Sequence, residues 1–191
     1  MSNETRTIRR SALNIRAMVE TALFVAMAFV LALIKLPSLP QGGTVTVLSM
    51  LPIIMIGIRR GTLWGLGGAV VYAGIQMLGG GFYPPPTPDF MGFLLVILLD
   101  YVIAFGVLGL SGLFSRRKYG LVYGSAVCIA LRFLCHFTSG MVIWGVYAED
   151  VPVWIYSLVY NGSYMGIELL ATTAAAFLLC KTVPKLLIRQ D

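Results

Sequence analysis

Charged side chains are scarce in this chain of 191 residues: 12% of the residues are Asp, Glu, Lys or Arg, whereas 58% are hydrophobic. A soluble globular domain has about 25% charged residues, so the composition excludes that class. Each helix that crosses a bilayer needs about 20 residues, which leaves room for roughly six spans and for no separate soluble domain. We therefore expect one all-α integral membrane domain over residues 1–191.

Cysteine and histidine are also rare, with three residues and one residue respectively. Cys128, Cys135 and Cys180 lie in apolar stretches without the spacing of metal ligands, which argues against a disulfide framework and a zinc site. We expect them to be packing residues, and we expect no metal and no cofactor. A Gly-x-x-x-x-Gly-Lys-Ser/Thr loop for ATP is missing as well, so any energy from ATP must come through partner proteins.

Long apolar segments, in contrast, recur along the chain and predict six transmembrane helices. The second segment is short for a span. In the third and fourth segments, glycine recurs at spacings that allow helices to approach closely, which is typical of bundle packing. The predicted spans run roughly over residues 17–36, 45–58, 62–78, 90–114, 121–147 and 153–180.

The charge distribution predicts the orientation. Basic residues lie in every second connection and acidic residues in the others, so the positive-inside rule places both termini in the cytoplasm. This rule accounts for the net charge of +6, and we expect no nucleic-acid role. Residues 1–16 are expected to form a retained cytoplasmic arm. The basic residues are Arg6, Arg9, Arg10, Arg16, Arg59, Arg60, Arg116, Arg117, Lys118, Lys181, Lys185 and Arg189, and the acidic ones are Asp89, Glu149 and Asp150.

Two ionisable side chains lie deep in the predicted helices. Asp100 is eleven residues from Asp89, and His136 is eleven residues from Tyr147. At 1.5 Å per residue, both lie roughly 16 Å below the outer surface. Ionisable residues inside a membrane are costly and are by default functional. The sequence therefore predicts that Asp100 and His136 share an outward-opening pocket.

An amide and several aromatic rings are expected to complete this pocket. Together with Asp100 and His136 they form the set that can hold a flat, cationic, hydrogen-bonding heterocycle. An interfacial aromatic belt is the alternative for the rings, but it does not explain a deep carboxylate. The glycine- and proline-rich outer loop at residues 79–86 is either a lid or a tight crossing. The predicted lining residues are Tyr83, Tyr101, Trp144, Tyr156 and Asn161.

Arg132 and Glu168 differ from the pocket residues. Both lie near the predicted midplane of the membrane, where an ion pair would offset the cost of removing each charge from water. We interpret them as a structural ion pair.

Two blocks of sequence resemble a known family. They are LRFLCHF at residues 131–137, followed by Gly140 and Trp144, and YSLVYNG at residues 156–162, with Asp100 and Tyr101 upstream. This pattern is similar to that of the thiamine-specific substrate-binding subunit, or S-component, of energy-coupling factor (ECF) transporters. The likeness covers nearly the whole chain. It implies six helices around an externally accessible thiamine site, with Asp100, Tyr101, His136, Trp144, Tyr156 and Asn161 as pocket residues.

The resemblance also implies partners and a location. The chain would lie in the prokaryotic plasma membrane with a transmembrane coupling subunit and two cytoplasmic ATPases, and would release its vitamin inside by toppling. Ala22 and Ala26 in the first helix resemble the family's docking surface for the coupling subunit, since small residues at spacing four make a flat groove. The expected function is high-affinity thiamine binding for uptake.

Two departures from the family pattern affect the substrate. The family's carboxylate is usually Glu, and Asp100 is one methylene shorter, so contact with a ligand becomes longer or water-mediated. The first outer loop, residues 36–43, lacks the family's Trp. Either the loop around Tyr83 supplies that face, or the ligand is a relative of thiamine.

Three other functions fit parts of the pattern. The first is an S-component for another vitamin or for a pyrimidine precursor. The second is an intramembrane serine protease with His136 as base and Ser111, Ser125 or Ser139 as nucleophile, although no separate orienting acid is evident. The third is a stand-alone facilitator, but the chain is small and shows no inverted repeat.

Overall fold

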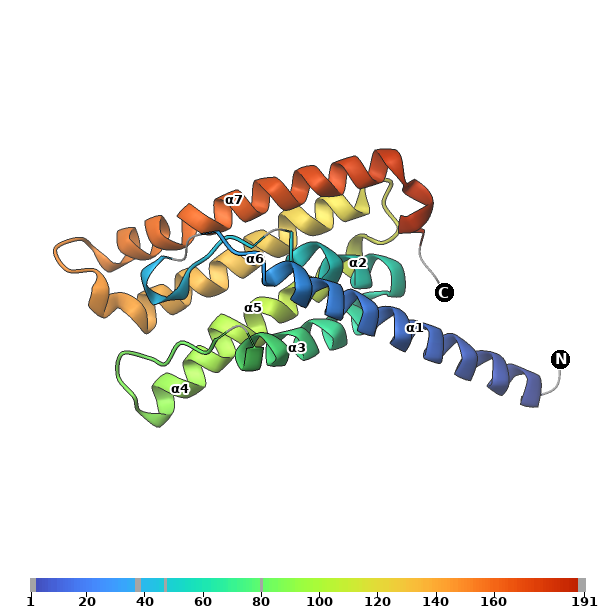
Figure 1. The fold of residues 1–191 in the computed structure, drawn as a ribbon, viewed down its shortest axis with the longest axis horizontal. Helices are drawn as coiled ribbons and strands as arrows, with labels where there is room; N and C mark the ends of the chain where they lie inside the picture. Colours follow the sequence, from blue (N-terminus) through green and yellow to red (C-terminus); the bar gives the residue numbers. More distant parts are fainter. Residues whose placement is uncertain (1–2, 37–38, 47, 80, 189–191) are drawn as a thin grey trace.

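A computed structural model describes residues 3–36, 39–46, 48–79 and 81–188. Gly80 and Arg189, which are part of the predictions above, lie outside the described residues, as do the side chains of Arg6, Arg9 and Arg10. The described chain is all-helical apart from its connections, and helices α1 to α7 form one bundle (Figure 1). The first helical element begins, and the last one ends, on the same side of the bundle (Figure 1), which agrees with two termini on one side of a membrane.

Helix α1 (Asn3–Ala32) is longer than its predicted span because the predicted arm continues it without a break. Its N-terminal part projects beyond the bundle (Figure 1). Residues that recur every three or four positions, including Phe24, Val25 and Ala28, are buried, as expected for one apolar face of a helix. This face packs against α2 and α3.

Helix α2 (Met50–Arg60) has 11 residues, of which Met50 to Ile58 are all buried. It rises about 16 Å, which is shorter than a hydrocarbon layer about 30 Å thick. The helix begins at Met50, later than the predicted segment of residues 45–58, and its role as a span stays a prediction. The connection at residues 33–49 precedes α2 and contains a tight turn at Pro40–Gly42 and an antiparallel bridge between Lys35 and Thr46.

Helix α3 (Thr62–Gly79) lies against the fourth segment at very close range. A Cβ atom on Gly109 would lie 2.3 Å from the backbone nitrogen of Leu66, so only glycine fits there. The fourth segment, Phe90–Phe114, is continuous as predicted, but its helical geometry changes along its length. It consists of α4 (Phe90–Val96), a π-helical turn (Ile97–Val102), α5 (Ile103–Gly106) and a 3-10 helix (Val107–Phe114).

The last two long helices are α6 (Gly120–Val142) and α7 (Val153–Thr182), which pack along each other (Figure 1). A short 3-10 turn (Trp144–Tyr147) follows α6, and another (Pro184–Leu187) follows α7. In the described part of the chain, four segments are long and apolar enough to cross a membrane: Asn14–Ala32, Phe90–Phe114, Gly120–Val142 and Val153–Thr182. Many large apolar side chains on the outside of the bundle are exposed, which suits contact with lipid.

An ion-pair cluster closes the end of the bundle where the termini lie. Glu20 of α1 pairs with Arg59 and Arg60 at the end of α2. Arg59 also donates a hydrogen bond to the carbonyl of Leu186. The first helix and the C-terminal turn are thus joined to the same point of α2.

Candidate functional site

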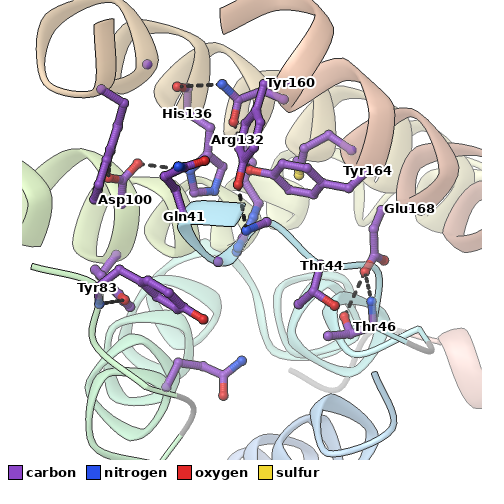
Figure 2. A pocket seen from close by; sticks show the side chains of 18 of the residues that line it. Gln41, Thr44, Thr46, Tyr83, Asp100, Arg132, His136, Tyr160, Tyr164 and Glu168 are labelled. Atoms are coloured by element: carbon purple, nitrogen blue, oxygen red, sulfur yellow. Dashed lines mark hydrogen bonds and ion pairs between the residues drawn. The ribbon is translucent and has the colours of Figure 1, made fainter. Parts of the chain in front are cut away.

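A cavity of about 190 Å³ lies in the half of the bundle away from the termini. Side chains from the π-helical turn, α6, α7 and the connection at residues 39–46 point into it (Figure 2). Its lining includes every residue predicted for the pocket: Tyr83, Asp100, Tyr101, His136, Trp144, Tyr156 and Asn161. Their contact with a ligand stays a prediction.

Asp100 is the centre of a hydrogen-bond network on one wall of the cavity. Its Oδ1 lies 3.0 Å from Nδ1 of His136, and its Oδ2 accepts hydrogen bonds from Ser139 Oγ at 2.7 Å and Trp144 Nε1 at 3.1 Å. A carboxylate only accepts, so the His136 ring donates through Nδ1. The π-helical turn that carries Asp100 is a geometry frequent at functional sites. Asp100 thus fixes the orientation of His136 and Trp144.

Trp144 reaches this network from a different element than the sequence indicated. The predicted span of residues 121–147 placed it on the same helix as His136, but α6 ends at Val142 and Trp144 begins the following 3-10 turn. Its indole still lines the cavity. Ser139, which the sequence analysis considered only as a nucleophile, is buried and donates to Asp100.

A stripe of polar-tipped side chains from α7 forms the opposite wall. Tyr156, Tyr160, Tyr164 and Glu168 follow at intervals of four, which places them along one face of a helix. The rings of Tyr156 and Tyr160 stack with centroids 5.8 Å apart, and those of Tyr160 and Tyr164 meet edge to face at 6.0 Å. The sequence analysis missed Tyr160 and Tyr164, although their spacing from Tyr156 was a usable signal.

Asn161 joins α7 to α6. Its Nδ2 donates to the carbonyls of His136 at 3.2 Å and Ser157 at 3.0 Å, and its Oδ1 accepts from the Tyr164 hydroxyl at 2.9 Å. A Cβ atom on Gly140 would lie 2.2 Å from Ser157 Oγ, so the two helices approach closely at this level. The amide hydrogens of Asn161 are therefore used to hold the cavity walls together.

The connection at residues 39–46 covers the cavity and is attached to α7 at two points. The Tyr160 hydroxyl accepts from the backbone nitrogen of Gly43 at 2.9 Å and donates to the carbonyl of Pro40. Further in, Glu168 Oε1 accepts from both the nitrogen and the hydroxyl of Thr46, the latter at 2.7 Å. Figure 2 shows both attachments as dashed lines. We call residues 39–46 the cover loop.

The outer loop after α3 meets the cover loop at the rim. Gly42 has a φ of 89°, and a Cβ atom on it would lie 2.3 Å from the Tyr83 ring. The aromatic ring therefore lies directly on this glycine. The Tyr101 hydroxyl donates to the carbonyl of Gly81 at 3.0 Å and holds the outer loop in place. Of the two readings of this loop, a lid and a tight crossing, this contact with the cover loop favours a lid.

The predicted ion pair between Arg132 and Glu168 is not formed. Among the described residues no salt bridge joins them. The guanidinium carbon of Arg132 lies 3.7 Å from the centroid of the Phe105 ring, while Glu168 binds Thr46. The sequence did not reveal that the cover loop enters the bundle and supplies donors to Glu168. Both residues line the cavity instead (Figure 2).

Several buried polar atoms of the cavity have no hydrogen-bond partner in the part of the chain that the structure describes. They are Nε2 of His136, Nε and Nη1 of Arg132, and Oε2 of Glu168. Buried polar groups are normally satisfied, so a group of them around one cavity indicates that a polar ligand belongs there.

The serine protease alternative gains no support from the geometry. The Ser111 hydroxyl donates to the carbonyl of Ile54 at 2.8 Å, Ser139 donates to Asp100, and Ser125 is buried. None of the hydrogen bonds found for the described residues links one of these hydroxyls to His136.

Comparisons with known proteins agree with this architecture. The chain matches the family model "Thiamine transporter protein (Thia_YuaJ)" over residues 18–188. It is 34% identical over 186 residues to the thiamine transporter ThiT of Bacillus subtilis (strain 168), covering 89% of this chain and 93% of that protein. It is 27% identical over 191 residues to the thiamine transporter ThiT of Lacticaseibacillus paracasei (strain ATCC 334), covering 90% of each.

The fold is also similar to a solved structure of ThiT from Listeria monocytogenes. The TM-score is 0.77 at 24% sequence identity, and the match covers 92% of this chain and 98% of that one. The similarity in structure therefore extends over the whole bundle. Because the family model matches nearly the full length of the sequence, the chain belongs to the thiamine transporter protein family.

Proposed function

We propose that this chain is the high-affinity thiamine-binding subunit of an ECF vitamin uptake transporter in a prokaryotic plasma membrane. The observation that carries the proposal is the cavity, which combines the Asp100–His136 pair, a stripe of aromatic rings and unpartnered polar atoms. The membership in a transporter family and the names of the two relatives support it. As a transport protein, the chain needs no catalytic residues.

Thiamine consists of an aminopyrimidine ring joined to a thiazolium cation that carries a hydroxyethyl group. His136 Nδ1 donates to Asp100, so in the neutral ring Nε2 is a buried acceptor, without a partner among the described residues, and is suited to the pyrimidine amine. The thiazolium cation suits the faces of Tyr156, Tyr160 and Trp144, since aromatic faces attract cations. Each of these rings lines the cavity.

In this scheme, Asp100 acts on the ligand through its charge and through His136 and Trp144. Its two oxygens already accept hydrogen bonds from three protein donors. Its negative charge still favours a bound cation, since a charge acts over several ångströms in a protein site, where the effective dielectric constant is lower than in water. The shorter side chain, compared with the family's Glu, is thus used to position His136 and Trp144.

Energy and release are assigned to partner subunits. Ala22 and Ala26 are exposed on α1, on the side away from the buried Phe24 and Ala28. A strip of small residues lets another helix approach closely, so we assign this surface to the transmembrane coupling subunit, which two cytoplasmic ATPases would drive.

The proposal can be tested with the purified chain alone. Thiamine should quench the fluorescence of Trp144, and calorimetry should show binding without any partner subunit. In a Trp144→Phe variant the quenching should disappear while weaker binding remains. Absence of binding by calorimetry would reject the thiamine assignment. Tighter binding of the free aminopyrimidine than of thiamine would assign the site to a pyrimidine precursor.

A further inference from the structure

Two opposite charges at the inner end of the cavity take no part in the function proposed so far. Glu168 is 2% exposed, and its Oε2 has no hydrogen-bond partner among the described residues. In the same part of the chain, Arg132 has two buried nitrogens, Nε and Nη1, without a partner. Both side chains line the cavity, and Figure 2 shows them pointing toward its interior. Leaving such groups unsatisfied is costly, so an interaction there would be strong.

This pair is set apart from the Asp100–His136 end. Arg132 precedes His136 by one turn of α6, and Glu168 follows Asn161 by seven residues of α7. At 1.5 Å per residue these offsets are about 6 Å and about 10 Å along the helices. The cavity therefore offers two polar ends to an elongated ligand, one at Asp100 and His136 and the other at Arg132 and Glu168.

Neighbouring groups hold both charged side chains in place. The guanidinium of Arg132 lies over the Phe105 ring at 3.7 Å. Glu168 uses Oε1 to bind Thr46 of the cover loop, and this leaves Oε2 free. Because each group is fixed by one contact, its remaining polar atoms are available without rearrangement, which lowers the cost of binding.

The chemistry of this end selects a neutral hydroxyl. A guanidinium only donates hydrogen bonds and a carboxylate only accepts them, so a group that does both can satisfy the two at once. A cation would be repelled by Arg132, and an anion by Glu168. We propose that Arg132 and Glu168 form a hydroxyl-binding subsite that recognises the terminal alcohol of the thiamine side chain. This inference rests on the proposed function, because the alcohol that the subsite recognises belongs to thiamine.

The test compares thiamine with an analogue that carries ethyl in place of hydroxyethyl, using calorimetry on the purified protein. The wild type should prefer thiamine by about 10- to 100-fold, as expected for hydrogen bonds to charged groups. Glu168→Gln keeps the shape and an acceptor for Thr46 but removes the charge. In this variant the preference should fall below about threefold, mainly through weaker binding of thiamine.

Arg132→Met serves as a second variant and should reduce the preference in the same way. Thr172→Val is the matched control, because Thr172 is buried on α7 one turn beyond Glu168, has an unpartnered hydroxyl and does not line the cavity. It should keep the wild-type preference.

The outcomes separate the two proposals. If the wild type binds thiamine and the ethyl analogue equally, the subsite is wrong while the thiamine assignment stands. If the preference persists in both Glu168→Gln and Arg132→Met, the alcohol is recognised elsewhere and the inference is overturned. If the wild type binds neither compound, the proposed function fails and this inference fails with it.

Discussion

Replacement of Tyr160 by phenylalanine isolates the attachment of the cover loop to α7. The substitution keeps the ring and its stacking on Tyr156 but removes the hydroxyl that binds Gly43 and Pro40. Gly43 is buried. In the variant, its backbone N–H therefore has no hydrogen-bond partner while the loop is closed, and it can bind water only when the loop opens. Two hydrogen bonds at about 0.5–1.5 kcal/mol each amount to about 1–3 kcal/mol in favour of opening.

This change in free energy corresponds to a shift of roughly 5- to 150-fold toward the open loop. If thiamine leaves through the open state, its dissociation rate should rise by a similar factor. The assay preloads the purified protein with radiolabelled thiamine and follows its loss during a chase with unlabelled vitamin. Tyr123→Phe is the control, since Tyr123 is 50% exposed on α6 and away from the cavity. An unchanged rate in Tyr160→Phe would show that this hydroxyl does not hold the loop closed.

Three other substitutions test the cavity wall, the helix packing and the docking surface. Asp100→Asn should weaken the binding of thiamine by about 2–5 kcal/mol, more than it weakens that of a neutral pyrimidine analogue; equal losses in calorimetry would limit Asp100 to hydrogen bonding and packing within the protein. Gly109→Ala should destabilise the bundle by about 1–3 kcal/mol, since its Cβ would lie 2.3 Å from a backbone nitrogen of α3. Gly106→Ala, where a Cβ meets nothing within 4 Å, should unfold at the wild-type temperature, and equal melting of the two variants would contradict the packing argument. Ala22→Trp should preserve thiamine binding in detergent and abolish uptake in cells; a parallel loss of binding would place Ala22 in the core.

The sequence predicted those features that depend on periodicity and burial. Asp100 and His136 were expected to meet because each lies at a similar depth in a long apolar segment, and their side chains are hydrogen-bonded. The four long spans were likewise visible as apolar runs. The apolar run of α2 has another physical origin, because its residues Met50 to Ile58 are buried in the bundle.

The features that the sequence did not predict depend on the path of the connections. No periodicity in the sequence predicts that the cover loop folds inward. Thr46 could therefore not be identified as the partner of Glu168. The pairing of Glu168 with Arg132 was the simplest expectation. The turn at residues 40–42 requires positive φ at Gln41 and Gly42. Glycine adopts positive φ readily, but its presence in a sequence predicts such a turn only weakly. Tyr160 lies one turn beyond Tyr156 on α7, but its contacts with Gly43 and Pro40 depend on the path of the cover loop, which the sequence does not show.

The short length of α2 has a consequence for the size of the ligand. Met50 and Ser49, at its start, line the cavity, so the cavity begins where this helix begins. One further helical turn at that end would add about 5.4 Å of backbone to the space that the cover loop and the ligand now share. The volume of the cavity is therefore governed by the number of residues in a neighbouring helix. Insertions or deletions before Met50 would change the size of ligand that the cavity accepts more directly than substitutions in its walls.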